Sequence, residues 1–179
     1  DDPSLSDAEI EAISVWARSG TPKGDVADAP EPLVFDDSLK WRAGEPDLIV
    51  KTEPITKLAG TADWWGEIPS VPTGLTEDRY VKSVEIVEVN DINNQVGTGR
   101  ETVGGRYIYH HMIWATAQMD ENGERQPGFS IPWPVHEVGR NADIFDEDAG
   151  RLLKANSWIV SDSVHLHSNG KDTTGHLEI

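Results

Sequence analysis

Residues 107–115 form the most apolar run of the sequence, and two adjacent histidines, His110 and His111, lie at its centre. Aromatic and β-branched residues over this length predict a strand that is buried on both faces. An imidazole in such a strand needs a polar partner, because burying an unpaired polar group costs roughly 1–3 kcal/mol. A metal ion bound by both rings would be one such partner.

The adjacency of His110 and His111 poses a geometric problem. Successive residues of a regular strand point to opposite faces of the sheet. Both rings reach one metal only where the strand lies at an edge, twists or contains a β-bulge. In the other arrangement one ring faces a cleft and the other is hydrogen-bonded inside the core. Strand geometry alone favours this second arrangement.

A second pair, His165 and His167, has the spacing that a strand places on one face. Two imidazoles at this spacing can bind one metal or can lie on a solvated face, and the spacing does not distinguish these. Of the remaining histidines, we expect His136 to pack or to support the site from a loop, and His176 to be solvated. The strand is predicted to have an apolar face of Trp158, Val160, Val164 and Leu166 and a polar face of Ser161, Ser163, His165 and His167.

Charge and composition exclude several classes of function. The 179 residues suffice for one domain with a core, and 15 Lys and Arg against 32 Asp and Glu give a net charge of −17. This charge argues against binding to nucleic acid or to an anionic membrane surface, and it suits cationic partners. The absence of cysteine excludes disulfides, thiolate metal sites and a cysteine nucleophile.

A metal site built only from imidazoles suits copper or zinc. Zinc on three histidines would leave an open position for hydrolysis, whereas copper would give a redox site, and composition does not choose between them. No stretch approaches the ~20 apolar residues of a transmembrane helix. The chain opens on Asp1-Asp2-Pro3 without an initiator methionine or a signal-peptide pattern, so we expect a mature product or a piece of a longer chain.

The chain is predicted to divide into an N-terminal helix with a connector and a β-rich remainder. Ser6 and Glu9 form a capping-box signature for a helix over residues 5–19, which carries an apolar stripe and ends at Gly20 and Pro22. A connector rich in Pro, Gly and Asp follows. The predicted domains are 1–38, a helix and linker, and 39–179, a β-sandwich.

Beyond the connector, runs of Val, Ile, Trp and Tyr are separated by turn signals such as Asn122-Gly123. Many strands without alternating helices predict an all-β fold, an antiparallel β-sandwich. We expect residues 119–155, with three prolines, to be a long irregular insertion. The predicted strands are 47–53, 64–71, 80–90, 105–118, 156–168 and 173–179.

Three segments, in their order along the chain, resemble one family. They are residues 71–81 (VPTGLTEDRYV), His110-His111-Met112, and residues 164–171 (VHLHSNGK). Together they resemble the type II copper, ascorbate-dependent monooxygenases, which include peptidylglycine α-hydroxylating monooxygenase and dopamine β-monooxygenase. The resemblance covers roughly residues 40–179 and is closest to bacterial members, in which such a domain follows a c-type cytochrome.

Order and spacing resemble the first of the family's two copper domains, the one that supplies electrons. The resemblance implies a copper ion held by His110, His111 and His165, with His167 as a further candidate ligand. It also implies a jelly-roll-like antiparallel β-sandwich with one short N-terminal helix, and a periplasmic or extracellular location. Hydroxylation requires a second copper domain, so we expect the partners to be that domain and a c-type cytochrome domain or other subunits.

The opening helix and residues 20–25 resemble the last helix and the exit of a bacterial cytochrome c domain. Without cysteine this chain cannot hold such a haem covalently, and the disulfides common in the animal enzymes are impossible. Two other functions stay open. One is a non-catalytic β-sandwich that serves as a structural or docking module of a larger extracytoplasmic assembly. The other is a zinc hydrolase that uses the same three histidines.

Overall fold

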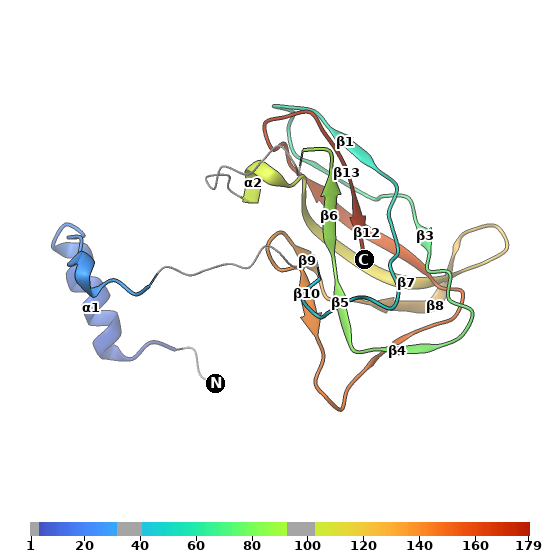
Figure 1. Ribbon diagram of the computed structural model, residues 1–179, viewed down its shortest axis with the longest axis horizontal. Coiled ribbons are helices and arrows are strands. Elements are labelled where there is room, and N and C mark those ends of the chain that lie inside the picture. The colour runs from blue at the N-terminus through green and yellow to red at the C-terminus, as the bar shows by residue number, and fades with distance from the viewer. Residues whose placement is uncertain (1–3, 32–40, 93–102) are drawn as a thin grey trace. The chain divides into compact units, whose positions relative to one another are not determined.

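The computed structural model describes residues 4–31, 41–92 and 103–179 (Figure 1). The chain forms two compact units, Asp1–Asp37 and Ser38–Ile179. The predicted domain boundary between residues 38 and 39 lies outside the described residues. In the described ranges no helix has both the length and the hydrophobicity that crossing a membrane requires.

The N-terminal unit contains helix α1 (Asp7–Arg18) and the 3₁₀ turn η1 (Val26–Asp28). The predicted capping box is confirmed, because the Ser6 N–H donates to Glu9 Oε2 over 2.8 Å and the Glu9 N–H donates to Ser6 Oγ over 3.4 Å. Gly20 lies just beyond the helix with φ +87°, a left-handed conformation that favours glycine. No residue of α1 is buried, so packing within this unit adds little to the stability of the helix.

The second unit consists of short strands with one long strand pair. Its described elements are β1 (Ile55–Lys57), β2 (Trp64–Gly66), β3 (Val71–Pro72), β4 (Arg79–Val81), β5 (Ser83–Glu85), β6 (Val87–Asn90), α2 (Val103–Arg106), β7 (Tyr109–Met119), β8 (Arg125–Pro132), β9 (His136–Glu137), β10 (Ala142–Ile144), β11 (Arg151–Leu153), β12 (Trp158–Leu166) and β13 (Thr173–Glu178). The predicted fold class, an all-β antiparallel sandwich with one short N-terminal helix, is confirmed.

The strands form one large sheet and three smaller groups. The large sheet has the order β2-β12-β7-β8, with β3 paired to β12 and β9 paired to β7. A three-stranded sheet has the order β1-β13-β6, and β10–β5 and β11–β4 are separate pairs. In Figure 1 the long strands β7 and β12 run side by side behind β6 and β13.

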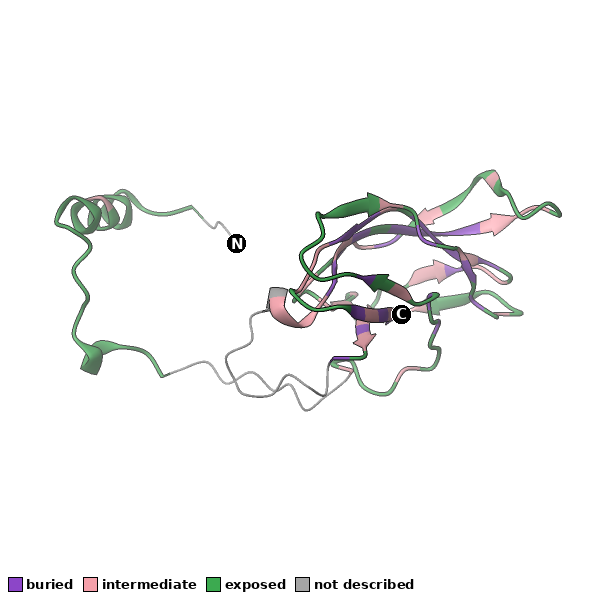
Figure 2. Ribbon diagram, turned by 90° about the horizontal axis from the view of Figure 1, so that it is seen from above, coloured by how far each residue is buried: buried purple, intermediate pink, exposed green. Residues whose placement is uncertain are grey.

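Two hydrophobic clusters lie on opposite faces of the β7–β12 pair. The larger cluster packs between the layers, and Figure 2 shows the buried residues along the strands of this unit. From β7 and β12 it receives Tyr109, Met112, Trp114, Ile159, Val164 and Leu166. The smaller cluster contains Ala115, Ala117 and Val160, with Met119 and Trp158 packed against them.

The structure corrects several predictions about the strands. Gly105 and Arg106, predicted to begin a strand, belong to helix α2. Residues 119–155 are not an irregular insertion, because β8, β9, β10 and β11 lie there. Most residues of β8 are exposed, so its sequence lacks the apolar alternation by which strands are recognised. Residues 47–53 are outside the named strands, although Val50 and Thr52 donate backbone hydrogen bonds to Ile179 and Leu177. Pro54 follows this segment and has no N–H to extend the pairing.

Candidate metal centre

The first irregularity of the β7–β12 ladder lies at Asp162. Ser161 pairs with Trp114 and Ser163 with Ile113, so Asp162 is an extra residue on β12. Such a bulge breaks the period of two by which side chains alternate between faces. The predicted apolar face is therefore wrong for its first half. Ile159 joins Val164 and Leu166 in the main core, whereas Trp158 and Val160 lie in the smaller cluster.

The second irregularity lies at His110, on the opposite strand. His165 pairs with His111 and Leu166 pairs with Tyr109, so His110 is an extra residue on β7 and restores the original register. Tyr109 and Met112 are both fully buried in the main core. The two residues between them, His110 and His111, therefore lie together on the other face. Of the two predicted arrangements, the structure has the bulged one.

Backbone groups around this bulge have partners inside the fold. The buried carboxylate of Glu88, on β6, accepts the N–H of Ile108 over 3.0 Å and the N–H of Tyr109 over 2.9 Å. The carbonyl of Ile108 accepts the N–H of His167, and the carbonyl of His110 accepts the N–H of Val138. Because buried backbone groups need partners, these bonds fix the path of the chain into the histidine pair.

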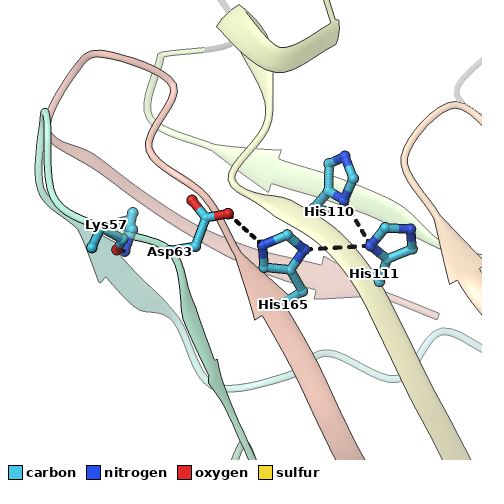
Figure 3. A network of polar contacts seen from close by, with 6 residues as sticks. Lys57, Asp63, His110, His111 and His165 are labelled. Carbon is cyan, nitrogen blue, oxygen red and sulfur yellow. Dashed lines mark hydrogen bonds and ion pairs between the residues drawn. The ribbon is translucent and has the colours of Figure 1, made fainter.

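Three imidazoles meet on the bulged face. His110 Nδ1 lies 2.7 Å from His111 Nδ1, and His111 Nδ1 lies 3.4 Å from His165 Nδ1 (Figure 3). One nitrogen from each ring lies within 4.8 Å of the other two. Two nitrogens that bind one ion at about 2.0–2.1 Å are about 2.8–3.5 Å apart when the angle between them is 90–120°. The two separations that involve His111 are close to those around a shared metal, and the His110 and His165 nitrogens lie within 4.8 Å, so the three rings are suitable ligands for one ion.

Asp63 orients the ring of His165. His165 Nε2–H donates to Asp63 Oδ2 over 2.8 Å, which leaves Nδ1 with a free lone pair for a metal. The same hydrogen bond holds the pKa of the Asp63 carboxyl below its usual value. Lys57 donates to the carbonyl of Ala62 and so ties down the loop that carries Asp63. Figure 3 shows this chain of contacts running from the loop to His111.

Trp65 covers one side of the centre. Direct pairing places Trp65 on β2, His165 on β12 and His111 on β7 in one row across the sheet. The Trp65 ring stacks on the His165 ring, with centroids 3.8 Å apart and planes 6° apart. Its centroid is 6.5 Å from that of His111. With 60% of its surface exposed, Trp65 separates part of the His165 ring from solvent while remaining accessible itself.

The surroundings of His110 favour its neutral form. Burial lowers the pKa of His110, and the neighbouring imidazoles of His111, His167 and His165 lower it further. A neutral imidazole has the lone pair that metal binding needs. The net charge of −17 also favours the approach of a cation.

The other three histidines lie outside the group. The ring centroid of His167 is 5.1 Å from that of His110, and its N–H bonds to the Ile108 carbonyl, so His167 borders the centre. His136 lies in β9 rather than in a loop, and burial lowers its pKa to about 4. The expectation that His176 is solvated is wrong for its Nε2, which is buried 3.7 Å from Glu178 Oε1, while about 25% of the side chain remains exposed.

Sequence reasoning missed Asp63, Trp65 and Glu88. Asp63 and Trp65 are about a hundred residues from His165 in the sequence, and only strand pairing brings them to it. Glu88 carried a weak signal. It is a charged residue inside a run of alternating valines, where an inward-facing carboxylate must have partners.

Comparison with known proteins gave no relatives. No family model matches the chain, and no curated protein or solved structure matches it. The function must therefore be inferred from the donor atoms, their surroundings and the sequence motifs.

Proposed function

We propose that residues 39–179 form a copper-binding, electron-transfer domain of a monooxygenase-like protein. The observation that carries the proposal is the β-bulge at His110, which puts His110 and His111 on the face that also carries His165. Three convergent imidazoles without a thiolate suit copper or zinc. The resemblance of the three ordered segments to the type II copper monooxygenases favours copper.

His110, His111 and His165 would hold the copper through their Nδ1 atoms. When bound, copper supplies a one-electron couple between Cu(II) and Cu(I). The protein's part is to fix the three rings before the metal arrives. The bulge sets the direction of His110 and His111, Asp63 holds a proton on His165 Nε2, and Trp65 limits the access of water to one ligand.

This arrangement supports electron transfer more than oxygen chemistry. Among the described residues, one group of three or more histidine or carboxylate side chains has metal-binding geometry. Hydroxylation in the resembled family needs two copper domains, so we do not expect residues 1–179 alone to hydroxylate a substrate. The proposal includes a second copper domain and a c-type cytochrome domain as partners, and a periplasmic or extracellular location.

A titration with Cu(II), followed by electron paramagnetic resonance, tests the proposal. We expect one equivalent to bind, to give a type II spectrum with nitrogen hyperfine structure, and to be reduced reversibly by ascorbate. His111→Ala and His165→Ala should abolish this spectrum, whereas His176→Ala, which removes a histidine of another sheet, should preserve it.

Three results would contradict the proposal. The same spectrum in His111→Ala and His165→Ala would place the copper elsewhere. Strong binding of zinc with a coordinated water, combined with weak binding of copper, would favour the hydrolase. No binding of either metal by the folded protein would favour the non-catalytic structural or docking module.

A further inference from the structure

A cavity of about 640 Å³, partly open to solvent, lies in the second unit. Trp114 of β7, Ile159 of β12 and Trp133 form its inner wall. Strands β4, β5 and β11 and the segment 41–50 contribute the outer wall. Trp114 and Ile159 belong to the main core, so the cavity lies on the face of the β7–β12 pair opposite the three histidines. Small-molecule pockets usually measure about 300–1,000 Å³.

Core residues line the hollow. Val50, Trp114, Trp133, Leu153 and Ile159 are each 8% exposed or less, yet all of them border it. Core side chains ordinarily interdigitate and leave few voids larger than a water molecule. The described residues of this unit therefore leave a space beside the core whose inner wall is mainly apolar.

Polar groups on the inner wall are already satisfied. Trp114 Nε1–H donates to the carbonyl of Pro134 over 2.8 Å, and Trp133 Nε1–H donates to Thr116 Oγ1 over 3.0 Å. The indole rings thus present apolar surface to the space. A well-bound water needs about 2–4 polar partners, which this wall does not offer. An apolar molecule therefore binds to this wall more favourably than water does.

The outer wall and the rim do not select a charged ligand. Arg79 and Lys82 border the cavity, and so do Glu45 and Asp47, so both signs of charge are present. The carboxylate of Glu85 also lines it, but that group accepts two backbone N–H groups of the segment 41–50. The net charge of −17 disfavours an anion.

We propose that this cavity is a binding site for an uncharged, apolar organic molecule with an aromatic or short aliphatic body. The site is independent of the metal centre, because the two use opposite faces of the same strands. Dispersion contacts with the indole rings and the burial of apolar surface supply its affinity.

The neutral dye N-phenyl-1-naphthylamine is a suitable probe for the full 179-residue chain. We expect one dye to bind per chain, with enhanced, blue-shifted emission. Leu153→Trp fills the cavity and should weaken binding at least tenfold while preserving the circular dichroism spectrum. Ile113→Trp adds the same ring at a half-exposed position on the histidine face and should change the affinity less than twofold.

Ile159→Phe, a smaller enlargement, replaces Leu153→Trp if the latter does not fold. Nuclear Overhauser contacts between the dye and the methyl groups of Leu153, Val81 and Ile159 should locate it in the unmodified chain. Absence of binding up to the solubility limit of the dye would overturn the proposal. Unchanged affinity in a folded cavity-filling variant, or contacts to Ile10 and Ile13 of α1 instead, would also overturn it.

Discussion

At both ends of the β7–β12 ladder the same two strands pair, but the geometry of the pairing differs. At one end, Trp158–Ser161 pair regularly with Ala117–Trp114, and neighbouring residues separate onto the two faces. At the other end, the extra residue His110 lets two neighbours share one face. The regular end makes a small apolar cluster, and the bulged end gathers three imidazoles. The extra residue His110 therefore makes the difference between an apolar packing surface at one end and a candidate metal centre at the other.

What fixes the bulge lies outside the strand that contains it. Glu88 of β6 accepts the N–H groups that precede His110, and Val138 donates to the carbonyl of His110. The regular end needs no such support, because its ladder satisfies its own backbone groups. By itself, β7 would point successive side chains to alternate faces of the sheet. The contacts from Glu88 and Val138 override this alternation at His110.

Deleting either extra residue is the strongest way to break this comparison. Deletion of His110 restores regular alternation of Tyr109 and His111 and also removes one ligand. Four-ligand zinc sites gain about 10–16 kcal/mol in total, or about 2.5–4 kcal/mol per ligand. The Cu(II) affinity should therefore fall about 100- to 1,000-fold. Deletion of Asp162 removes the other bulge without removing a ligand, and affinity should stay within about threefold. Isothermal titration calorimetry of both variants measures this. Equal losses would show that the bulge at His110 has no special role.

His136 tests whether water reaches the core side of the ladder near the bulge at His110. Its pKa is about 4 in the folded chain against 6.5 ordinarily, so between these values only the unfolded state takes up the proton. The stability that a neutral His136 contributes is complete above pH 6.5 and is lost as the pH falls toward 4. Urea unfolding of the metal-free protein should show a loss of about 2–3 kcal/mol between pH 7.5 and 4.5 that His136→Leu lacks. Parallel pH profiles for the two proteins would show that His136 is hydrated.

Glu88 and Glu85 form a matched pair of buried carboxylates, each accepting two backbone N–H groups. Glu88→Gln and Glu85→Gln should each cost about 1–3 kcal/mol in urea unfolding, because a backbone donor loses its charged acceptor. Only Glu88→Gln should also weaken copper binding, since Glu85 accepts the N–H groups of Arg42 and Ala43 and none of those that lead into the histidine pair. Equal copper affinity in the two variants would remove Glu88 from the account of the bulge.

Asp63→Asn tests the orientation of His165. Loss of the carboxylate partner should lower Cu(II) affinity about 10- to 100-fold, as is usual for hydrogen-bond partners of metal-binding histidines. Asp148→Asn removes the same charge from an exposed position and should leave the affinity unchanged. A similar fall in both variants would mean that Asp63 acts only through the total negative charge of the chain.

His167→Ala should have the smallest effect. The ring borders the centre but does not belong to its group of three donors, so copper affinity should change less than about threefold. Competition with a fluorescent chelator resolves a change of this size. A loss as large as that caused by His165→Ala would make His167 a ligand.

The sequence was sufficient to predict the sandwich, the capped helix and which three histidines lie together, whereas their binding of a metal stays a prediction. Strand periodicity predicts the sandwich, and the Ser6–Glu9 pair predicts the helix. A family resemblance predicts the three histidines. It could not place the bulges at Asp162 and His110, because an extra residue looks like any other until the partner strand is known. The same limit hid Asp63 and Trp65, whose roles exist only through pairing between distant strands.

The central claim is that His110 and His111 bind one metal together with His165. X-ray absorption spectroscopy of the protein with one equivalent of copper tests it directly by counting the imidazoles around the ion. The account predicts three imidazoles in the unmodified chain and two in His110→Ala. Two imidazoles in both proteins would contradict it, because His110 would then lie beside the metal without binding it.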